Sequence, residues 1–119
     1  MKIALTCMCS LLLTFCAMSQ NTEMKLPAPQ KTGGMPLMEA LSKRATNRSL
    51  DPARSLSDQQ LSNLLWAAWG INRPDGRRTA ASAMNRQEID LYLVGRKAAY
   101  LYDAKEHSLK LVAEGGHRS

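Results

Sequence analysis

Two polar clusters hold the side chains best suited to bind a ligand, and the first spans residues 44–48. It reads Arg-Ala-Thr-Asn-Arg, with two guanidinium groups four residues apart. Guanidinium forks and a threonine hydroxyl can converge on one phosphate, because each supplies hydrogen-bond donors that match its oxygens. The other interpretation is a solvated helix end whose basic residues complement the helix dipole. Spacing alone favours this second interpretation.

The second cluster spans residues 78–87 and reads Arg-Thr-Ala-Ala-Ser-Ala-Met-Asn-Arg-Gln. Its small residues at 79–83 would let a flat ligand approach the backbone. The side-chain amides of Asn85 and Gln87 can each donate and accept hydrogen bonds, which suits the edge of a heteroaromatic ring. The alternative is a polar surface loop, and composition alone favours that alternative.

The remaining reactive side chains support few other chemistries. All three cysteines lie in the first sixteen residues, and the two histidines, His107 and His117, lie outside both clusters. Because the chain has two histidines, counting residues does not exclude a Ser/His/Asp triad, but no nucleophile-elbow pattern supports one. The sequence also lacks a glycine-rich phosphate loop and a spaced set of metal ligands. We therefore predict no metal site.

Length and charge narrow the class of protein. The chain has 119 residues, of which 45% are hydrophobic, and a formal net charge of +6. This length and composition predict one globular domain. The basic charge favours an anionic ligand. Nucleic acid is not the expected partner, because the basic residues are scattered and are not interleaved with aromatic ones.

Residues 1–19 have the pattern of an export signal. Lys2 precedes an uncharged apolar run, and small residues occupy both positions that a signal peptidase reads before Gln20. The run is too short for a comfortable membrane span, so we expect cleavage and no stable membrane insertion afterwards. A lipoprotein acylated at Cys16 is the weaker alternative, since the bulky Phe15 precedes it. A buried core helix and an uncleaved anchor are disfavoured. The expected location is periplasmic or envelope-associated.

After an extended linker at residues 20–34, two helical segments precede β-like sequence. A first helix is expected from Met35 to Lys43 or Arg44. The clearest helix follows, because Ser57 and Gln60 form a capping box and Gly70 supplies a stop. Its predicted apolar stripe consists of Leu61, Leu64, Leu65 and Ala68, and Trp66 and Trp69 widen this stripe.

A long polar connection at residues 71–88 leads to three short apolar runs. These runs, at residues 89–94, 98–102 and 109–111, predict strands. The sequence therefore predicts an α+β fold, with two N-terminal helices followed by an antiparallel hairpin or meander of at most three strands. Such a sheet leaves open edges, so we expect the complete domain to continue beyond Ser119.

The order and spacing of the two polar clusters resemble the FMN-dependent nitroreductase family over residues 36–115. Residues 44–48 are similar to the family's Arg-x-Ser-x-Arg element, with Thr46 where serine is usual. Residues 81–87 are similar to its Pro-Ser-x-x-Asn-x-Gln element, with Ala81 in place of proline. By this resemblance, residues 35–119 form the N-terminal part of a nitroreductase-like domain. The residues that would bind FMN are Arg44, Thr46, Arg48, Ser82, Asn85 and Gln87.

The resemblance also implies an activity. Members are homodimers with FMN at the subunit interface, and they pass hydride from NAD(P)H through FMN to a nitroaromatic, a quinone or a similar small acceptor. The flavin does this chemistry, so no catalytic residue is assigned. Residues 100–103 and His107 resemble a hairpin of the branch that includes thiazoline-forming oxidases, where His107 is a turn residue. The alternatives are a small exported binding module without catalysis and an inactive fragment.

Overall fold

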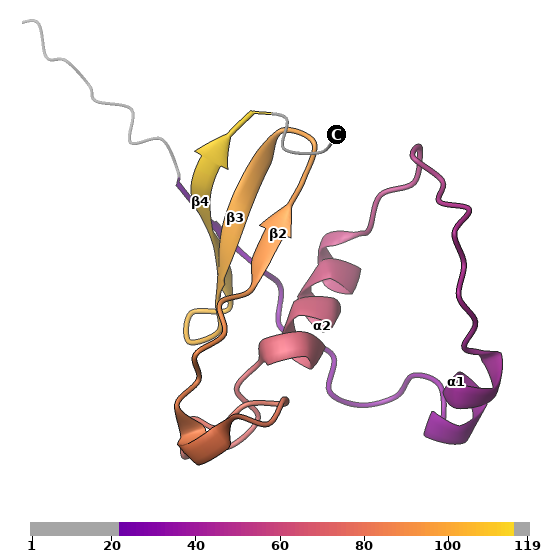
Figure 1. Ribbon diagram of the computed structural model, residues 1–119, viewed down its shortest axis with the longest axis horizontal. Coiled ribbons are helices and arrows are strands. Elements are labelled where there is room, and N and C mark those ends of the chain that lie inside the picture. Colours follow the sequence, from indigo (N-terminus) through magenta and orange to yellow (C-terminus); the bar gives the residue numbers. More distant parts are fainter. Residues whose placement is uncertain (1–21, 116–119) are drawn as a thin grey trace, which may run out of the picture.

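A four-stranded antiparallel sheet packs against one helix (Figure 1). The computed structural model describes residues 22–115. The expected export signal, the cysteines and His117 lie outside the described residues. The elements in chain order are β1 (Glu23–Lys25), α1 (Leu37–Lys43), α2 (Asp58–Trp69), the 3-10 turn η1 (Ala83–Asn85), β2 (Tyr92–Val94), β3 (Ala98–Asp103) and β4 (Ser108–Glu114). This arrangement confirms the predicted α+β fold of two helices followed by antiparallel strands.

Helix α2 begins at the predicted capping box. The backbone N–H of Gln60 donates to Ser57 Oγ at 3.2 Å, and the Ser57 N–H donates to Gln60 Oε1 at 3.0 Å. The helix ends at Gly70, whose N–H donates to the Trp66 carbonyl oxygen at 2.7 Å. A Cβ atom on Gly70 would lie 2.5 Å from that same oxygen. Close approach to Trp66 therefore explains why glycine ends this helix.

The buried face of α2 differs from the predicted stripe. Ser62 has no exposed surface, and Leu65 and Trp69 are buried, whereas Leu64 is 55% exposed and Ala68 is exposed. The face toward the sheet thus follows positions 62, 65 and 69, which share one side of a helix. A serine can occupy this face because its hydroxyl is satisfied there. The prediction for Leu64 and Ala68 was wrong.

The core lies between α2 and the sheet. Leu65 and Trp69 of α2 contact Tyr102 of β3 and Leu109 of β4, and Leu109 has no exposed surface. The partly buried residues around this cluster are Leu26, Leu61, Leu91, Leu93, Tyr100 and Ala104. The core is small, so each buried side chain carries a large share of the packing.

Strand β1 lies within the segment expected to be an extended linker. It pairs antiparallel with β4, with Glu23 opposite Lys110 and Lys25 opposite Ser108, and so adds a fourth strand to the predicted three. The chain then runs along α2, where the Gln30 N–H donates to Asn63 Oδ1 at 2.8 Å. The segment is extended as expected, but its first residues belong to the sheet.

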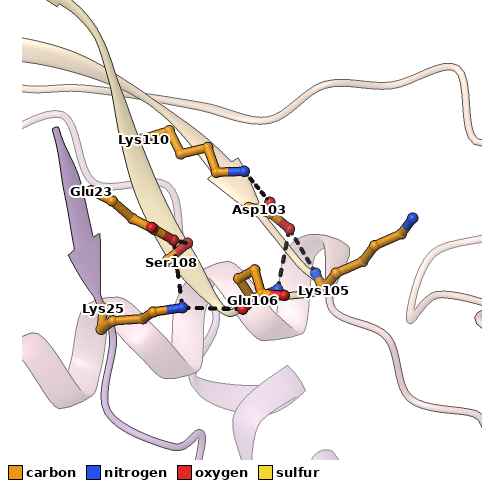
Figure 2. Close-up of polar contacts among 7 residues, drawn as sticks. All are labelled: Glu23, Lys25, Asp103, Lys105, Glu106, Ser108 and Lys110. Carbon is orange, nitrogen blue, oxygen red and sulfur yellow. Dashed lines mark hydrogen bonds and ion pairs between the residues drawn. The ribbon is translucent and has the colours of Figure 1, made fainter.

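Polar and charged side chains join β1 to the start of β4 and to the turn that precedes it (Figure 2). Lys25 Nζ lies 3.1 Å from Glu106 Oε2 and 3.5 Å from Glu23 Oε1. The fully buried Ser108 donates its hydroxyl to Glu23 Oε1 at 2.6 Å, and this bond lowers the pKa of Glu23 below its ordinary value. These contacts fix the register of a strand only three residues long.

The β3–β4 turn is held by one carboxylate (Figure 2). Asp103 Oδ1 accepts the backbone N–H groups of Lys105 at 2.9 Å and Glu106 at 3.2 Å. Its Oδ2 atom lies 2.6 Å from Lys110 Nζ. The bond to Lys110 lowers the pKa of Asp103, so this carboxylate stays ionised and keeps the turn closed.

The second strand is shorter than predicted, since β2 covers Tyr92–Val94 and not residues 89–94. A backbone hydrogen bond from the Tyr102 N–H to the Leu91 carbonyl, at 2.9 Å, continues the pairing just before β2.

Among residues 22–115, neither helix has the length and apolar character needed to cross a bilayer.

Candidate functional site

Residues of the second polar cluster line an open cavity of about 470 Å³. Of the residues proposed to contact a flavin, Ser82 and Asn85 line this cavity, whereas Gln87 does not. The lining residues are Arg73, Arg77, Arg78, Ala80, Ala81, Ser82, Met84 and Asn85. The polar loop thus forms a wall of the cavity together with the preceding turn.

The loop backbone adopts a conformation that most residues avoid. Met84, Asn85 and Gln87 have φ angles of 52°, 54° and 51°. They are three of the four non-glycine residues with positive φ in the described part of the chain. The left-handed region costs about 1–2 kcal/mol per residue, although asparagine tolerates it better than most. Other contacts must therefore hold this loop in shape, and such strain is typical of functional sites.

Gln87 supplies several of these contacts. Its backbone N–H donates to Ser82 Oγ at 2.7 Å. Its side-chain Nε2 donates to Asn85 Oδ1 at 2.9 Å and to the Gly76 carbonyl at 3.0 Å. Gln87 therefore ties together Ser82, Asn85 and the turn around residue 76.

Arg78 connects the loop to α2. Its Nε donates to Gln87 Oε1 at 2.8 Å, and its Nη1 donates to the Trp69 carbonyl at 3.0 Å. The guanidinium carbon also lies 4.9 Å from the centre of the Trp69 ring, within the range of a cation–π contact. Helix α2 has no basic residue in its last turn, so its final carbonyls need a donor from elsewhere. That missing donor is the sequence signal that could have identified Arg78.

The cavity wall is rich in positive charge. Arg73, Arg77 and Arg78 line it, and none of the lining residues among residues 22–115 is acidic. Arg77 is partly neutralised by Asp75, whose Oδ2 lies 3.2 Å from the Arg77 Nε atom. Three guanidinium groups, one hydroxyl and one carboxamide form a donor set suited to an anionic ligand with a polar ring edge. Sequence reasoning gave Arg73 and Arg77 no role, although the basic run at residues 73–78 marked them.

The first polar cluster lies apart from this cavity. Arg44 is the C-cap of α1, and Thr46 and Arg48 follow it in an exposed segment without regular structure. In Figure 1 this segment lies on the opposite side of α2 from η1. The structure of one chain therefore does not bring residues 44–48 together with Ser82, Asn85 and Gln87.

A buried polar network joins α2 to the β3–β4 turn. The His107 Nε2 atom lies 2.7 Å from Ser62 Oγ and 3.1 Å from the Pro27 carbonyl oxygen. Its Nδ1 atom lies 2.9 Å from the Tyr102 hydroxyl. Burial lowers the pKa of His107 and raises that of Tyr102, so both side chains are held neutral.

This network resembles a catalytic triad only in the order of its contacts. Ser62 has no exposed surface, so its hydroxyl cannot reach a substrate. A tyrosine also stands where a triad needs a carboxylate to stabilise the imidazolium. His107 lies in the turn, as expected, and its role is to join the turn to α2 and the N-terminal arm.

Two further observations concern metal ligands and a second cavity. Within the described residues, no group of three or more His, Cys, Asp or Glu side chains converges to hold a metal ion. A second cavity, of about 570 Å³, lies between residues 50–56 and the β2–β3 turn and contains none of the proposed site residues.

The comparisons with known proteins identify the family of this chain. The model of the nitroreductase family matches residues 41–119, a range that contains both polar clusters. The crystal structure of a protein named "putative nitroreductase" from Ralstonia eutropha JMP134 is 41% identical in sequence, with a TM-score of 0.77. The match covers 82% of this chain and 47% of that one, so the chain spans about half the length of the relative. Comparison with curated proteins found no match. The family match and the shared fold show that this chain belongs to the nitroreductase family.

Proposed function

We propose that this protein acts as an FMN-dependent oxidoreductase that uses NAD(P)H to reduce a nitroaromatic, a quinone or a similar acceptor. The observation that carries the proposal is the strained loop at residues 82–87 beside an arginine-lined cavity, within the region that matches the nitroreductase family. When bound, FMN supplies the hydride chemistry, and the protein supplies binding and orientation.

The residues around the cavity fit a flavin in chemical type. Ser82 and Asn85 offer a hydroxyl and an amide to the polar edge of a ring, and Ala80 and Ala81 leave the backbone accessible. In this proposal Arg44, Thr46 and Arg48 hold the phosphate and part of the ring. All three are exposed, so their donors are accessible to a ligand.

The separation of the two clusters supports a site shared between two copies of the chain. Helix α1 buries none of its residues, and Leu37, Met38 and Leu41 are 71%, 75% and 55% exposed. An apolar helix face of this kind gains stability when another chain covers it. We propose a homodimer in which residues 44–48 of one copy meet residues 82–87 of the other at the flavin.

Mixing two variants tests the shared site. Arg48→Ala and Asn85→Ala homodimers should each bind FMN poorly. After equal amounts are unfolded and refolded together, about one quarter of the sites should be intact, because half of the dimers are mixed and one of their two sites is unaltered. The readout is tight FMN binding in the mixture. If the mixture binds no more FMN than the separate variants do, the shared site is refuted. The two clusters then either belong to a site within one chain or form no flavin site.

Titration of the full chain with FMN tests the proposal itself. We expect quenching of flavin fluorescence that saturates, followed by bleaching of the bound flavin when NADH or NADPH is added without oxygen. The matched control is Arg54→Ala, which removes an exposed arginine outside both clusters. A folded full chain that takes up no FMN would overturn the assignment.

Two finer proposals concern the branch and the location. Residues 100–103 and His107 support membership of the branch that includes thiazoline-forming oxidases. A survey of acceptors that includes thiazoline substrates beside nitroaromatics and quinones tests this.

The pattern of residues 1–19 supports export to the periplasm or envelope. Mass spectrometry of the secreted product would reveal whether the chain begins at Gln20.

The alternative is an exported binding module without catalysis. The arginine-lined cavity supports it, because three guanidinium groups bind an anion whether or not hydride transfer follows. Binding of anionic small molecules by a monomer that ignores FMN would favour this alternative over the oxidoreductase.

A further inference from the structure

The side chain of Gln87 is occupied inside its own loop. A carboxamide has two N–H hydrogens, and here they serve the Gly76 carbonyl at 3.0 Å and Asn85 Oδ1 at 2.9 Å. Its oxygen accepts the Arg78 Nε hydrogen at 2.8 Å. Gln87 therefore has no donor left for a ligand, and it does not line the cavity.

Arg78 joins this amide to the most regular part of the fold. Its Nη1 donates to the last carbonyl of α2, that of Trp69, at 3.0 Å, and its guanidinium lies over the Trp69 ring. Trp69 is itself part of the buried core. Arg78 also forms a backbone bridge with Ile71, so both its side chain and its backbone are fixed.

Asn85 accepts a hydrogen bond from Gln87, which in turn is held by Arg78. Its Oδ1 atom accepts from Gln87, so the amide orientation is set and the Nδ2 group is turned away from Gln87. Asn85 lines the cavity and has a left-handed φ of 54°. A side chain on a strained backbone keeps one orientation only while its neighbours hold it.

We propose that Arg78 and Gln87 are positioning residues, which hold the loop at residues 82–87 against α2 and orient Asn85 toward the ligand. This assigns Gln87 a different role from the direct flavin contact that the sequence indicated. The identity of the ligand rests on the proposed function, but the support of the loop by Arg78 and Gln87 does not. Its test therefore has two independent parts.

The first part measures hydrogen exchange of the full chain without ligand. In Gln87→Ala and Arg78→Gln, exchange across residues 82–87 should rise by about 10-fold, because two or more bonds that hold the loop are lost. Exchange in α2 and in β3 should stay unchanged. Gln87→Glu is the matched variant, since it keeps an acceptor for Arg78 but loses both donated bonds. Its loop exchange should lie between that of the unaltered chain and that of Gln87→Ala. Unchanged loop exchange in all three variants would overturn the proposal.

The second part is a double-mutant cycle on FMN affinity. Gln87→Ala should weaken binding by about 10-fold, as the loss of a supporting residue behind a ligand contact commonly does. If Gln87 acts through Asn85, Asn85→Ala combined with Gln87→Ala should bind no more weakly than Asn85→Ala alone. Additive losses would instead assign Gln87 a direct contact and refute the positioning role.

The two parts separate the two ideas. A chain that binds no FMN would refute the proposed flavin function while the exchange result still decides whether Arg78 and Gln87 hold the loop. Arg78→Lys offers a further check, because lysine keeps the charge but lacks the fork that reaches Gln87 and Trp69 together. Loop exchange in Arg78→Lys should lie between that of the unaltered chain and that of Arg78→Gln. Exchange as slow as in the unaltered chain would show that the positive charge alone suffices.

Discussion

Replacing His107 should cost the fold about 3 kcal/mol. The ring bonds to the Ser62 hydroxyl, the Pro27 carbonyl and the Tyr102 hydroxyl. A hydrogen bond contributes about 1 kcal/mol net, and a buried polar group that loses its partner costs about 1–3 kcal/mol. Ser62 retains a bond to the Pro27 carbonyl at 2.5 Å, so the larger loss falls on Tyr102.

The backbone of His107 allows the ring's contribution to be separated from strain. Its φ angle is 48°, a conformation that glycine adopts freely and alanine does not. His107→Gly removes the ring and the strain, whereas His107→Ala removes the ring alone. We therefore expect His107→Ala to be less stable than His107→Gly by about 1 kcal/mol.

Urea unfolding followed by tryptophan fluorescence measures both differences, because Trp66 and Trp69 both lie on α2. Lys105→Ala, an exposed change in the same turn, is the control and should cost under about 0.5 kcal/mol. If His107→Ala costs less than about 1 kcal/mol, the network does not hold the turn to α2 and the reasoning fails.

Acid should weaken the same network. Burial lowers the pKa of the His107 imidazole below its ordinary 6.5, and the positive charge of Lys31 lowers it further. The folded chain thus binds this proton more weakly than the unfolded chain. The stability that results is fully present above pH 6.5 and is lost as the pH falls through the folded pKa. In His107→Gly this part of the pH dependence should vanish, and its persistence would assign it to another group.

Three further changes have defined outcomes. Gly70→Ala should lower the melting temperature by an amount equivalent to about 1–3 kcal/mol, because the new Cβ would lie 2.5 Å from the Trp66 oxygen. Leu109→Ala should cost about 2–5 kcal/mol in chemical denaturation, since Leu109 has no exposed surface. The bond from Lys110 lowers the pKa of Asp103 below its ordinary 3.8, so the stability from Asp103 is present above that pH and is lost on further acidification. Asp103→Asn should flatten this acid limb of a pH titration of stability, and an unchanged limb would exclude Asp103.

The elements that could be predicted are those whose causes are local. The capping box of α2 needs only Ser57 and Gln60, three residues apart, and the structure has both of its bonds. Strand β1 was missed because Glu-Met-Lys has no strand pattern, and its conformation is set by pairing with β4, far along the chain. Ser62 was missed as a buried residue for the same reason. Its partners, Pro27 and His107, lie 35 and 45 residues away.

The candidate site shows the same division. Composition alone favoured a polar surface loop at Ser82 and Asn85, and the family resemblance gave these residues a flavin-binding role. The structure places both on one cavity, and their role in flavin binding stays a prediction. The missing basic residue in the last turn of α2 indicates that a donor is needed there, but the sequence does not show that Arg78 supplies it, because this depends on where the last carbonyl of α2 points. The roles of Arg44, Thr46 and Arg48 stay predictions, since they depend on a ligand and on the proposed second copy of the chain.

The pairing of β1 with β4 has a consequence for synthesis of the protein. The Leu111 N–H donates to the Thr22 carbonyl at 2.7 Å, and Ser108 at the start of β4 lies 85 residues after its contact Glu23, so the first strand finds its partner only after β4 has left the ribosome. Closing so long a loop costs more entropy than forming the β3–β4 hairpin, which needs only neighbouring residues. We expect the hairpin and α2 to form first and β1 to dock last. Until then the edge of β4 is exposed, and nascent chains crowded on one message are most prone to pair with one another during that interval.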